Sequence, residues 1–321
     1  MRIREFATAG ASCAMVIAGL LLVVCLNAGG AHYLFTSFRG NGEDGLHLAL
    51  STNGYHWSAV RGDKSFFRPE IGGKLMRDPC IARGPDGVFH MVWTTSWTAQ
   101  SGKVIGYART RDLVNWSQQK GIPLMQNEPG TRNLWAPELF YDSARNRWLI
   151  LWSSTVTNRF QETNGTGDDG YNHRIYYTTT RDFEEFAESR LLYDPGFNII
   201  DATIFERKGK FYMVLKDERK TPLKKNLRLS VADRPEGPYG PPGEPFTISW
   251  VEGPSVLAIG DEIYVYFDHY SRPHYYGAVR SKDLVTWVDV SKDMVFPRDH
   301  RHGTVISIPE DIASALMKLN Q

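Results

Sequence analysis

The chain has 321 residues, of which 42% are hydrophobic, 12% aromatic and 23% charged, so it can bury a large core. This composition excludes an intrinsically disordered chain, which needs low hydrophobicity and a high net charge. The 37 basic and 36 acidic residues nearly balance, so nothing indicates a nucleic-acid or other polyanionic partner.

The first 31 residues have the pattern of a signal peptide. A short basic start with Arg2 and Arg4 precedes an apolar run at 14–26, and small residues follow at 28–31. We predict cleavage near 28–31 and export of residues 32–321 as one secreted or periplasmic domain. An uncleaved membrane anchor is the alternative, since the apolar run is only somewhat short for a bilayer span of about 20 residues.

Residues 32–321 are predicted to be nearly all β. Short runs rich in Tyr, Phe, Trp and Val recur between Gly, Pro, Asn and Asp residues, and helical periodicity is confined to 308–319. A turn of the form Ser/Thr/Ala-x-Asp/Asn, followed by an aromatic residue, recurs along the chain. Its copies lie at 49–57, 108–116, 178–186, 230–239 and 278–287.

This repeat predicts a five-bladed β-propeller. The turn residues are separated by 59, 70, 51 and 50 residues, which corresponds to one four-stranded blade per period. Each blade alone would expose an apolar face, and closing the ring buries these faces. Segment 33–60 lacks a preceding inner strand, and 302–308 has an inner-type strand with nothing after it. We therefore expect the N-terminal strands to complete the last blade and leave no free sheet edge there.

Five short motifs precede the blades, where the innermost strands should begin at one mouth of the central channel. The charged residues of the motifs follow one another at spacings of 60, 63, 51 and 50. A common register in every blade would gather these side chains around one axis. The motifs are Met76-Arg77-Asp78-Pro79, Trp135-Ala136-Pro137-Glu138, Ile200-Asp201-Ala202-Thr203, Val251-Glu252-Gly253-Pro254 and Arg301-His302-Gly303-Thr304.

Asp-Pro, Trp-Ala-Pro, Ile-Asp, Glu-Gly-Pro and His-Gly, in this order and at blade spacing, resemble glycoside hydrolase family 43 over essentially all of 32–321. The resemblance implies a glycosidase with Asp78 as general base, Glu252 as general acid and Asp201 tuning and orienting the acid. His302 is similar to a histidine that organises a calcium or sodium ion on the propeller axis. No organic cofactor is implied.

The chemistry of inversion needs the same residue types. A general acid protonates the leaving oxygen while a general base activates water on the opposite face of the sugar, with carboxyls about 6.5–9.5 Å apart. The first and fourth blades of a five-bladed ring can bracket such a gap. Asp201, from the blade before Glu252, is placed to raise the pKa of the acid.

Aromatic and polar residues near the same mouth are predicted to bind the sugar. Aromatic faces stack on sugar rings, and short polar groups bind hydroxyls. The expected substrate-binding residues are Arg77, Trp97, Trp135, Glu138, Asp268 and Arg301. The glycine-rich insertion at 158–173 is predicted to be a flap that narrows the pocket.

Two departures from the family pattern leave the substrate open. The third motif has Ala202 where proline is commoner, and the second has Glu138 where Asp is frequent. Both keep the carboxylates that the mechanism needs. By resemblance, we expect a monomeric enzyme that releases terminal α-L-arabinofuranosyl or β-D-xylosyl residues from plant-type poly- or oligosaccharides.

Two other interpretations stay open. A retaining, fructosidase-like enzyme shares the five-bladed ring, although its Arg-Asp-Pro motif belongs to the third blade, whereas Arg77-Asp78-Pro79 falls in the first. A non-catalytic sugar-binding propeller would bind carbohydrate without turnover. The intact set of Asp78, Asp201 and Glu252 argues against this second interpretation.

Overall fold

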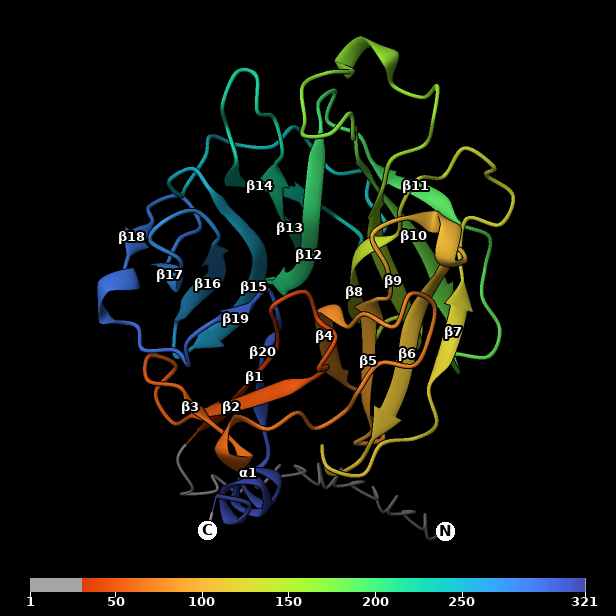
Figure 1. The fold of residues 1–321 in the computed structure, drawn as a ribbon. Helices are drawn as coiled ribbons and strands as arrows, with labels where there is room; N and C mark the ends of the chain where they lie inside the picture. Colours follow the sequence, from red (N-terminus) through yellow and green to blue (C-terminus); the bar gives the residue numbers. More distant parts are fainter. Residues whose placement is uncertain (1–30, 321) are drawn as a thin grey trace, which may run out of the picture.

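The computed structural model describes residues 31–320, whose strands form five small sheets arranged like blades around a central axis (Figure 1). All but the last residue of the predicted leader at 1–31 lies outside these residues. None of the helices described is long and apolar enough to cross a bilayer. The predicted five-bladed β-propeller is confirmed.

Four blades follow one another along the chain, each with its innermost strand first. The first blade is β4 (Arg77–Arg83), β5 (Phe89–Thr94), β6 (Val104–Thr110) and β7 (Lys120–Pro123). The second is β8 (Trp135–Asp142), β9 (Arg147–Ser154), β10 (Arg174–Thr180) and β11 (Arg190–Tyr193). The third is β12 (Ile199–Arg207), β13 (Lys210–Asp217) and β14 (Asn226–Ala232). The fourth is β15 (Val251–Ile259), β16 (Glu262–His269), β17 (Tyr275–Ser281) and β18 (Val288–Asp289).

The third blade has three strands rather than the expected four. Segment 237–246 lies in the outer position and donates to β14 through the amides of Gly240, Gly243 and Phe246, at 3.0, 2.9 and 3.1 Å. Four of the ten residues in this segment are proline, at 238, 241, 242 and 245. Proline has no N–H group, so a regular ladder of hydrogen bonds cannot form here.

The fifth blade joins the two ends of the chain, as predicted. It consists of β1 (His32–Arg39), β2 (His47–Ser51), β3 (Ser58–Ala59), β19 (His300–Arg301) and β20 (Val305–Ile308). On β1, Leu34 pairs with Ile306 of β20 and Phe38 pairs with Arg301 of β19. The N-terminal strand thus lies between β2 and the C-terminal strands, which removes the free edge that an open ring would have.

The hydrophobic core lies between adjacent blades. Phe35 is fully buried, with its ring centroid 4.7 Å from that of Tyr276 on β17 and 5.1 Å from that of Phe296. Trp93 on β5 and Trp152 on β9 are among the largest fully buried side chains. The aromatic runs of the repeat therefore have a packing role, since each blade buries its apolar face against the next.

The repeated turn closes through its own side chains. Asp112, Asp182 and Asp283 each accept hydrogen bonds from two backbone amides just after them, at 2.7 to 3.0 Å. Such Asx-type bonds stabilise a tight turn locally. In the first, second and fourth blades this turn connects the third strand to the outermost one.

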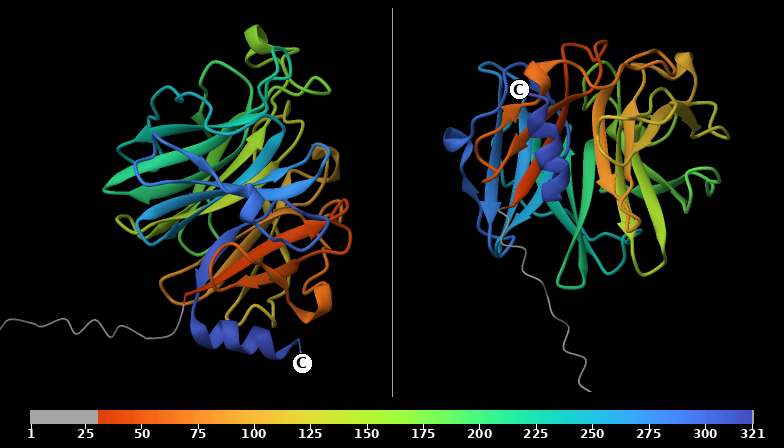
Figure 2. Two further views of the ribbon diagram at one scale, coloured as in Figure 1. Left: turned by 90° about the vertical axis from the view of Figure 1, so that its left-hand side faces the viewer. Right: turned by 90° about the horizontal axis from the view of Figure 1, so that it is seen from below.

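A short helix, α1 (Glu310–Lys318), follows β20 and confirms the helical periodicity at 308–319. It lies on the outside of the ring (Figure 2). Its buried residues Ala313 and Leu316 join Leu34 and Leu46 in one apolar cluster. Four single-turn 3₁₀ helices complete the described elements: η1 (Arg61–Asp63), η2 (Ala99–Ser101), η3 (Gln161–Thr163) and η4 (Ser291–Asp293).

Thr36→Val should weaken the closure of the ring. The buried Thr36 hydroxyl donates to the Pro79 carbonyl at 3.0 Å and accepts from the Thr304 amide at 3.1 Å. Valine has nearly the same shape but leaves that amide unpaired, so the free energy of unfolding should fall by about 1–3 kcal/mol. Denaturant titration measures the loss. The exposed Thr52→Val is the control, with an expected change within about 0.5 kcal/mol.

Candidate active site

The innermost strands of the first four blades share one irregularity. In each strand, the pairing with the second strand shifts by one at a β-bulge between two paired residues that lie three positions apart. The residue that follows the first of these two has a positive φ. These residues are Asp78 (φ 52°), Ala136 (47°), Asp201 (53°) and Gly253 (58°). Bulges of this kind re-aim side chains and are frequent beside active sites.

Hydrogen bonds from one blade to the next hold three of these bulges. The Ala136 amide donates to the Thr94 hydroxyl of the first blade at 2.8 Å, and the Asp201 amide donates to the Ser153 hydroxyl of the second blade at 3.1 Å. The Gly253 amide donates to the Asp201 carboxylate at 3.1 Å. The sequence motifs therefore mark where neighbouring blades are joined at the mouth.

The expectation of one register for all motif residues is wrong for Glu252 and Glu138. Glu252 directly precedes its bulge residue, and Glu138 follows its bulge residue by two positions, whereas Asp78 and Asp201 are the bulge residues themselves. The extra residue of a bulge changes which side chains share a face, and motif spacing cannot show where that residue is inserted.

The predicted catalytic residues meet in a cavity of about 210 Å³. Asp78, Asp201 and Glu252 come from the first, third and fourth blades, and His302 from the fifth. Four of the six residues predicted to bind substrate also line it. The lining residues are Arg77, Asp78, Trp97, Trp135, Ile200, Asp201, Lys216, Glu218, Glu252, Arg301 and His302.

Asp78 faces a histidine and a hydroxyl. Its Oδ1 lies 3.3 Å from Nδ1 of His302, and its Oδ2 accepts a hydrogen bond from Thr94 at 2.8 Å. Burial alone would raise the pKa of Asp78, but the charge and hydrogen bond of His302, with the nearby Arg77, hold it well below its usual range. Asp78 is therefore ionised across the physiological range.

His302 is the cationic partner of this carboxylate. Burial alone would lower its pKa, but the carboxylates of Asp78 and Asp201 raise it to about 9. Its Nδ1 lies 3.9 Å from Oδ2 of Asp201. A buried imidazolium therefore lies against two of the three predicted catalytic carboxylates.

Asp201 is the carboxylate that holds a proton more readily. Burial raises the pKa of Asp201 to about 6, against the opposing charges of His302 and Lys216, and the negative charges of Glu252 and Asp78 add to the increase. Both of the other predicted catalytic carboxylates therefore raise the pKa of Asp201.

Both oxygens of the Glu252 carboxylate have cationic partners. Lys216 Nζ donates to Oε2 at 3.0 Å, and Arg301 Nη2 donates to Oε1 at 2.8 Å. Lys216 also pairs with Glu218 at 2.7 Å. Lys216 and Glu218 were absent from the residues predicted for the site. They belong to the run Lys216-Asp217-Glu218-Arg219 at the end of β13. The sequence signal that could have identified them is a charged run at a strand end that reaches the mouth.

Glu138 and Asp268, both predicted to bind substrate, do not line the cavity. Glu138 is buried deeper, accepts a hydrogen bond from Thr203 at 3.0 Å, and has its pKa raised to about 7 by burial. Asp268 is fully buried and accepts from Arg301 Nε at 3.0 Å and from the His302 amide at 3.3 Å. Asp268 therefore positions Arg301 from behind the cavity wall.

Two tryptophans form one rim of the cavity. Trp97 is 48% exposed and meets Trp135 edge to face, with ring centroids 5.7 Å apart. The Trp135 indole N–H donates to the Trp97 carbonyl at 3.1 Å. The Arg77 guanidinium lies over the Trp97 ring, 4.1 Å from its centroid. These rings can stack on a sugar that enters the cavity.

The insertion at 158–173 lies at the same mouth, as the lime-green loop at the top of Figure 1. Residues at its end, including Asp168, Tyr171 and His173, line a second cavity of about 490 Å³. This cavity shares Trp97, Trp135 and Glu218 with the first. Tyr171 and His173 were not predicted as site residues, because only the length and glycine content of the loop were informative.

His302 does not fit an ion site well. Its Nδ1 is turned to Asp78, and the raised pKa favours a protonated ring, which has no free lone pair to bind a metal. The axial calcium or sodium ion predicted from the family resemblance stays a prediction, and no step of the chemistry considered below depends on it.

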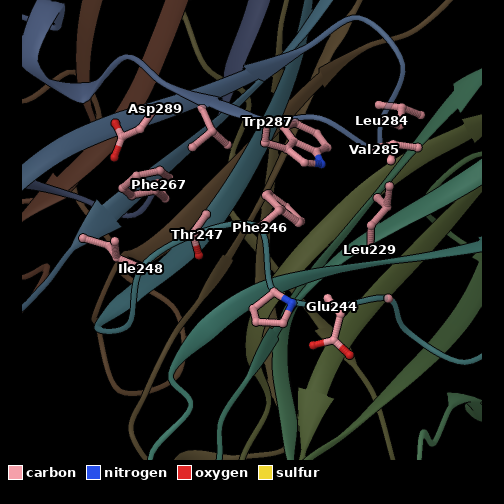
Figure 3. A pocket seen from close by; sticks show the side chains of 13 residues that line it. Leu229, Glu244, Phe246, Thr247, Ile248, Phe267, Leu284, Val285, Trp287 and Asp289 are labelled. Atoms are coloured by element: carbon pink, nitrogen blue, oxygen red, sulfur yellow. The ribbon is translucent and has the colours of Figure 1, made fainter.

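A larger cavity, of about 710 Å³, lies elsewhere, between the third and fourth blades (Figure 3). Its walls are mainly apolar and include Phe246, Trp287 and Val285. None of the residues predicted for catalysis lines it. Size alone therefore does not identify the site, whereas the convergence of titratable groups from several blades does.

Similar proteins were found by sequence and by structure. An alpha-L-arabinofuranosidase of Bifidobacterium longum subsp. longum is 30% identical over 169 residues, which are 47% of this chain and 16% of that protein. This chain thus matches a small part of a much longer relative. The alpha-L-arabinofuranosidase structure from Lactobacillus brevis has a TM-score of 0.53 at 19% identity, over 67% of this chain and 72% of that chain.

A thermostable family-43 glycoside hydrolase gives a TM-score of 0.52 at 17% identity, over 70% of this chain and 75% of that chain. At such identities, both structures support the fold alone. The model of a family described as a probable glycosyl hydrolase domain, related to family 43, matches residues 30–312. The chain therefore belongs to this family of glycosyl hydrolase domains related to glycoside hydrolase family 43.

Proposed function

We propose that this protein is a glycosidase that hydrolyses O-glycosyl bonds with inversion, using Asp78 as general base and Glu252 as general acid. The observation that carries the proposal is the convergence of Asp78, Asp201 and Glu252, from three separate blades, on one cavity of about 210 Å³. Family membership and the arabinofuranosidase relative support the same reaction class.

Asp78 has the properties that a general base needs. It remains ionised because His302 and Arg77 offset the cost of its burial. The Thr94 hydroxyl donates to Oδ2 at 2.8 Å and fixes the orientation of the carboxylate. An ionised and oriented carboxylate can accept the proton of a water molecule as that water attacks the anomeric carbon.

Glu252 must gain a proton before it can protonate the leaving oxygen. In the structure, its two oxygens accept from Lys216 and Arg301. We infer that an entering sugar takes over these two donors through its hydroxyl groups and so frees the carboxyl. Asp201, with a pKa raised to about 6, can share a proton with Glu252 in the same site.

The proposed substrates carry terminal α-L-arabinofuranosyl or β-D-xylosyl groups. The small first cavity favours a single terminal sugar, with the tryptophan rim of Trp97 and Trp135 as its stacking surface. The second cavity, beside the insertion, has room for the next units of a chain. Two similar proteins are named alpha-L-arabinofuranosidases, which agrees with this choice.

We also propose that the protein is exported. The support is the basic start, apolar run and small-residue tail of the first 31 residues. An uncleaved anchor in the membrane is the alternative. Either route brings the propeller outside the cytoplasm, where plant-derived polysaccharides are encountered.

Purified protein should hydrolyse nitrophenyl α-L-arabinofuranoside, nitrophenyl β-D-xyloside or both. NMR of the first-formed product should show the anomeric configuration opposite to that of the substrate. Retention would instead indicate a nucleophile at Asp78 and the fructosidase-like alternative. Saturable binding of these sugars without release of nitrophenol, in protein that is fully folded, would indicate the non-catalytic propeller. An Asp78→Asn preparation controls for contaminating glycosidases.

Glu252→Gln should lower kcat/KM by about 10²–10⁴-fold on substrates with poor leaving groups, which need a protonated leaving oxygen. On substrates with good leaving groups the loss should be much smaller, whereas Asp78→Asn should lower activity on both kinds. Steady-state kinetics on matched alkyl and dinitrophenyl glycosides measures the contrast. Glu262→Gln is the control, because this residue pairs with Arg280 and does not line the cavity. Full activity of Glu252→Gln on alkyl glycosides would exclude Glu252 as the acid.

His302 should titrate near pH 9, as its two carboxylate neighbours require. Replacing Asp78 by Asn removes the largest influence that raises this pKa, so the titration should move down toward the ordinary value or below it. NMR of the imidazole resonance across pH 5–10 measures both. Asp283→Asn, at an exposed turn, should leave the titration unchanged. A midpoint at or below pH 6.5 in the unaltered protein would contradict the ion pair and the basis for an ionised Asp78.

A further inference from the structure

A second cluster of titratable side chains lies in the fifth blade. His47 is on β2, Asp63 is in η1 and His300 is on β19. Asp63 Oδ1 lies 3.1 Å from Nδ1 of His47 and 3.0 Å from Nε2 of His300. The three ligand atoms all lie within 4.8 Å of one another. Among the described residues 31–320, this is the group of histidine, cysteine and carboxylate side chains close enough to share one metal ion.

The other nitrogen of each imidazole has its own partner. Nε2 of His47 lies 2.9 Å from the Asp44 carboxylate, and Nδ1 of His300 contacts the Ser37 hydroxyl. Each partner can accept a hydrogen bond from the ring N–H, which leaves the inward nitrogen with its lone pair. Histidines that bind metals nearly always donate their second N–H in this way, and a carboxylate is a frequent acceptor.

The carboxylate of Asp63 is oriented in the same manner. Its Oδ2 accepts a hydrogen bond from Arg39 Nη1 at 3.0 Å, which leaves Oδ1 directed at the two imidazoles. The outer partners Asp44, Ser37 and Arg39 thus hold all three inward atoms toward one point.

The two histidines are buried, yet the hydrogen bonding within the cluster is incomplete. The side chains of His47 and His300 are 2% and 0% exposed, whereas that of Asp63 is 28% exposed. Nε2 of His300 is buried and has no properly aligned hydrogen-bond partner, although Asp63 is only 3.0 Å away. A buried nitrogen left in this state is costly unless something else occupies its lone pair.

We propose that His47 Nδ1, His300 Nε2 and Asp63 Oδ1 bind a divalent transition metal ion of the Zn²⁺ type. Zinc takes imidazole and carboxylate ligands at about 2.0–2.2 Å in a tetrahedron, which places the ligand atoms about 3.4 Å from one another. The two separations from Asp63 Oδ1, 3.1 and 3.0 Å, are close to this value, and the two imidazole nitrogens lie within 4.8 Å of each other. The partly exposed side of Asp63 leaves the fourth position to water.

The position of this site gives the metal a role in closing the ring. His47 and Asp63 belong to the N-terminal part of the fifth blade, and His300 belongs to the C-terminal strand that pairs with β1. One ion would therefore tie together the two ends of the chain. An ion that binds the folded form alone stabilises it in proportion to the logarithm of its concentration.

Calorimetric titration of chelator-stripped protein with Zn²⁺ tests the proposal. We expect one ion per chain and a thermal unfolding midpoint that rises with Zn²⁺ concentration. His47→Gln and Asp63→Asn should abolish this binding. Asp44→Asn, at a side chain that is 47% exposed and outside the ligand set, should weaken it by about 10–100-fold. Asp261→Asn, at a side chain that is 78% exposed, is the matched control and should change nothing.

Two results would overturn the proposal. One is the absence of stoichiometric Zn²⁺ binding in the unaltered protein, which would leave the cluster as a hydrogen-bonded network. The other is binding that survives in folded His47→Gln and Asp63→Asn but is lost in Asp78→Asn or Glu252→Gln, which would place the ion at the mouth. Neither readout uses glycosidase activity, so the outcome is independent of the proposed function.

Discussion

Pairing of the N-terminal strand β1 with the C-terminal strands β19 and β20 is the constraint on which the rest of the molecule depends. This pairing brings His302, near the end of the chain, to within 3.3 Å of Asp78, near its beginning. The site thus exists only in the closed ring. The electrostatics of the site consequently depend on the stability of the closed ring, because an open ring would separate the imidazolium from its carboxylates.

Burial then makes every charge at the mouth depend on a neighbour. A lone carboxylate there would be protonated, and a lone histidine would be neutral. Because the two groups lie side by side, Asp78 stays ionised and His302 stays protonated. Asp201 lies farther from the imidazolium, at 3.9 Å, and has a pKa of about 6. Two aspartates at equivalent bulge positions thereby acquire different pKa values, which is the kind of difference that acid–base chemistry requires.

Much of the fold could be predicted from the sequence, because a turn and an aromatic strand recur once per blade and the incomplete segments fall at the two ends. The three predicted catalytic carboxylates were brought to one cavity for a related reason, since each lies near the start of an inner strand. The different depths of Glu138 and Glu252 could not be predicted, because a β-bulge shifts the side-chain register without changing motif spacing. Lys216 and Glu218 could not be assigned to the site, because only the fold brings the end of β13 against Glu252, which is 36 residues from Lys216 in the sequence.

The glycines of two motifs show why the motifs occur together. A Cβ on Gly253, where φ is +58°, would lie 2.3 Å from Cγ of His302, so the imidazole can approach Asp78 only if the fourth blade has no side chain at this point. A Cβ on Gly303 would lie on the backbone of Thr36 in β1 and would prevent the closing strand from packing. Each glycine therefore leaves room for a residue from another strand. The Glu-Gly-Pro and His-Gly motifs are separate in sequence, but His302 and Gly303 are consecutive, so the contact that keeps the proposed base ionised lies directly beside the contact that closes the ring.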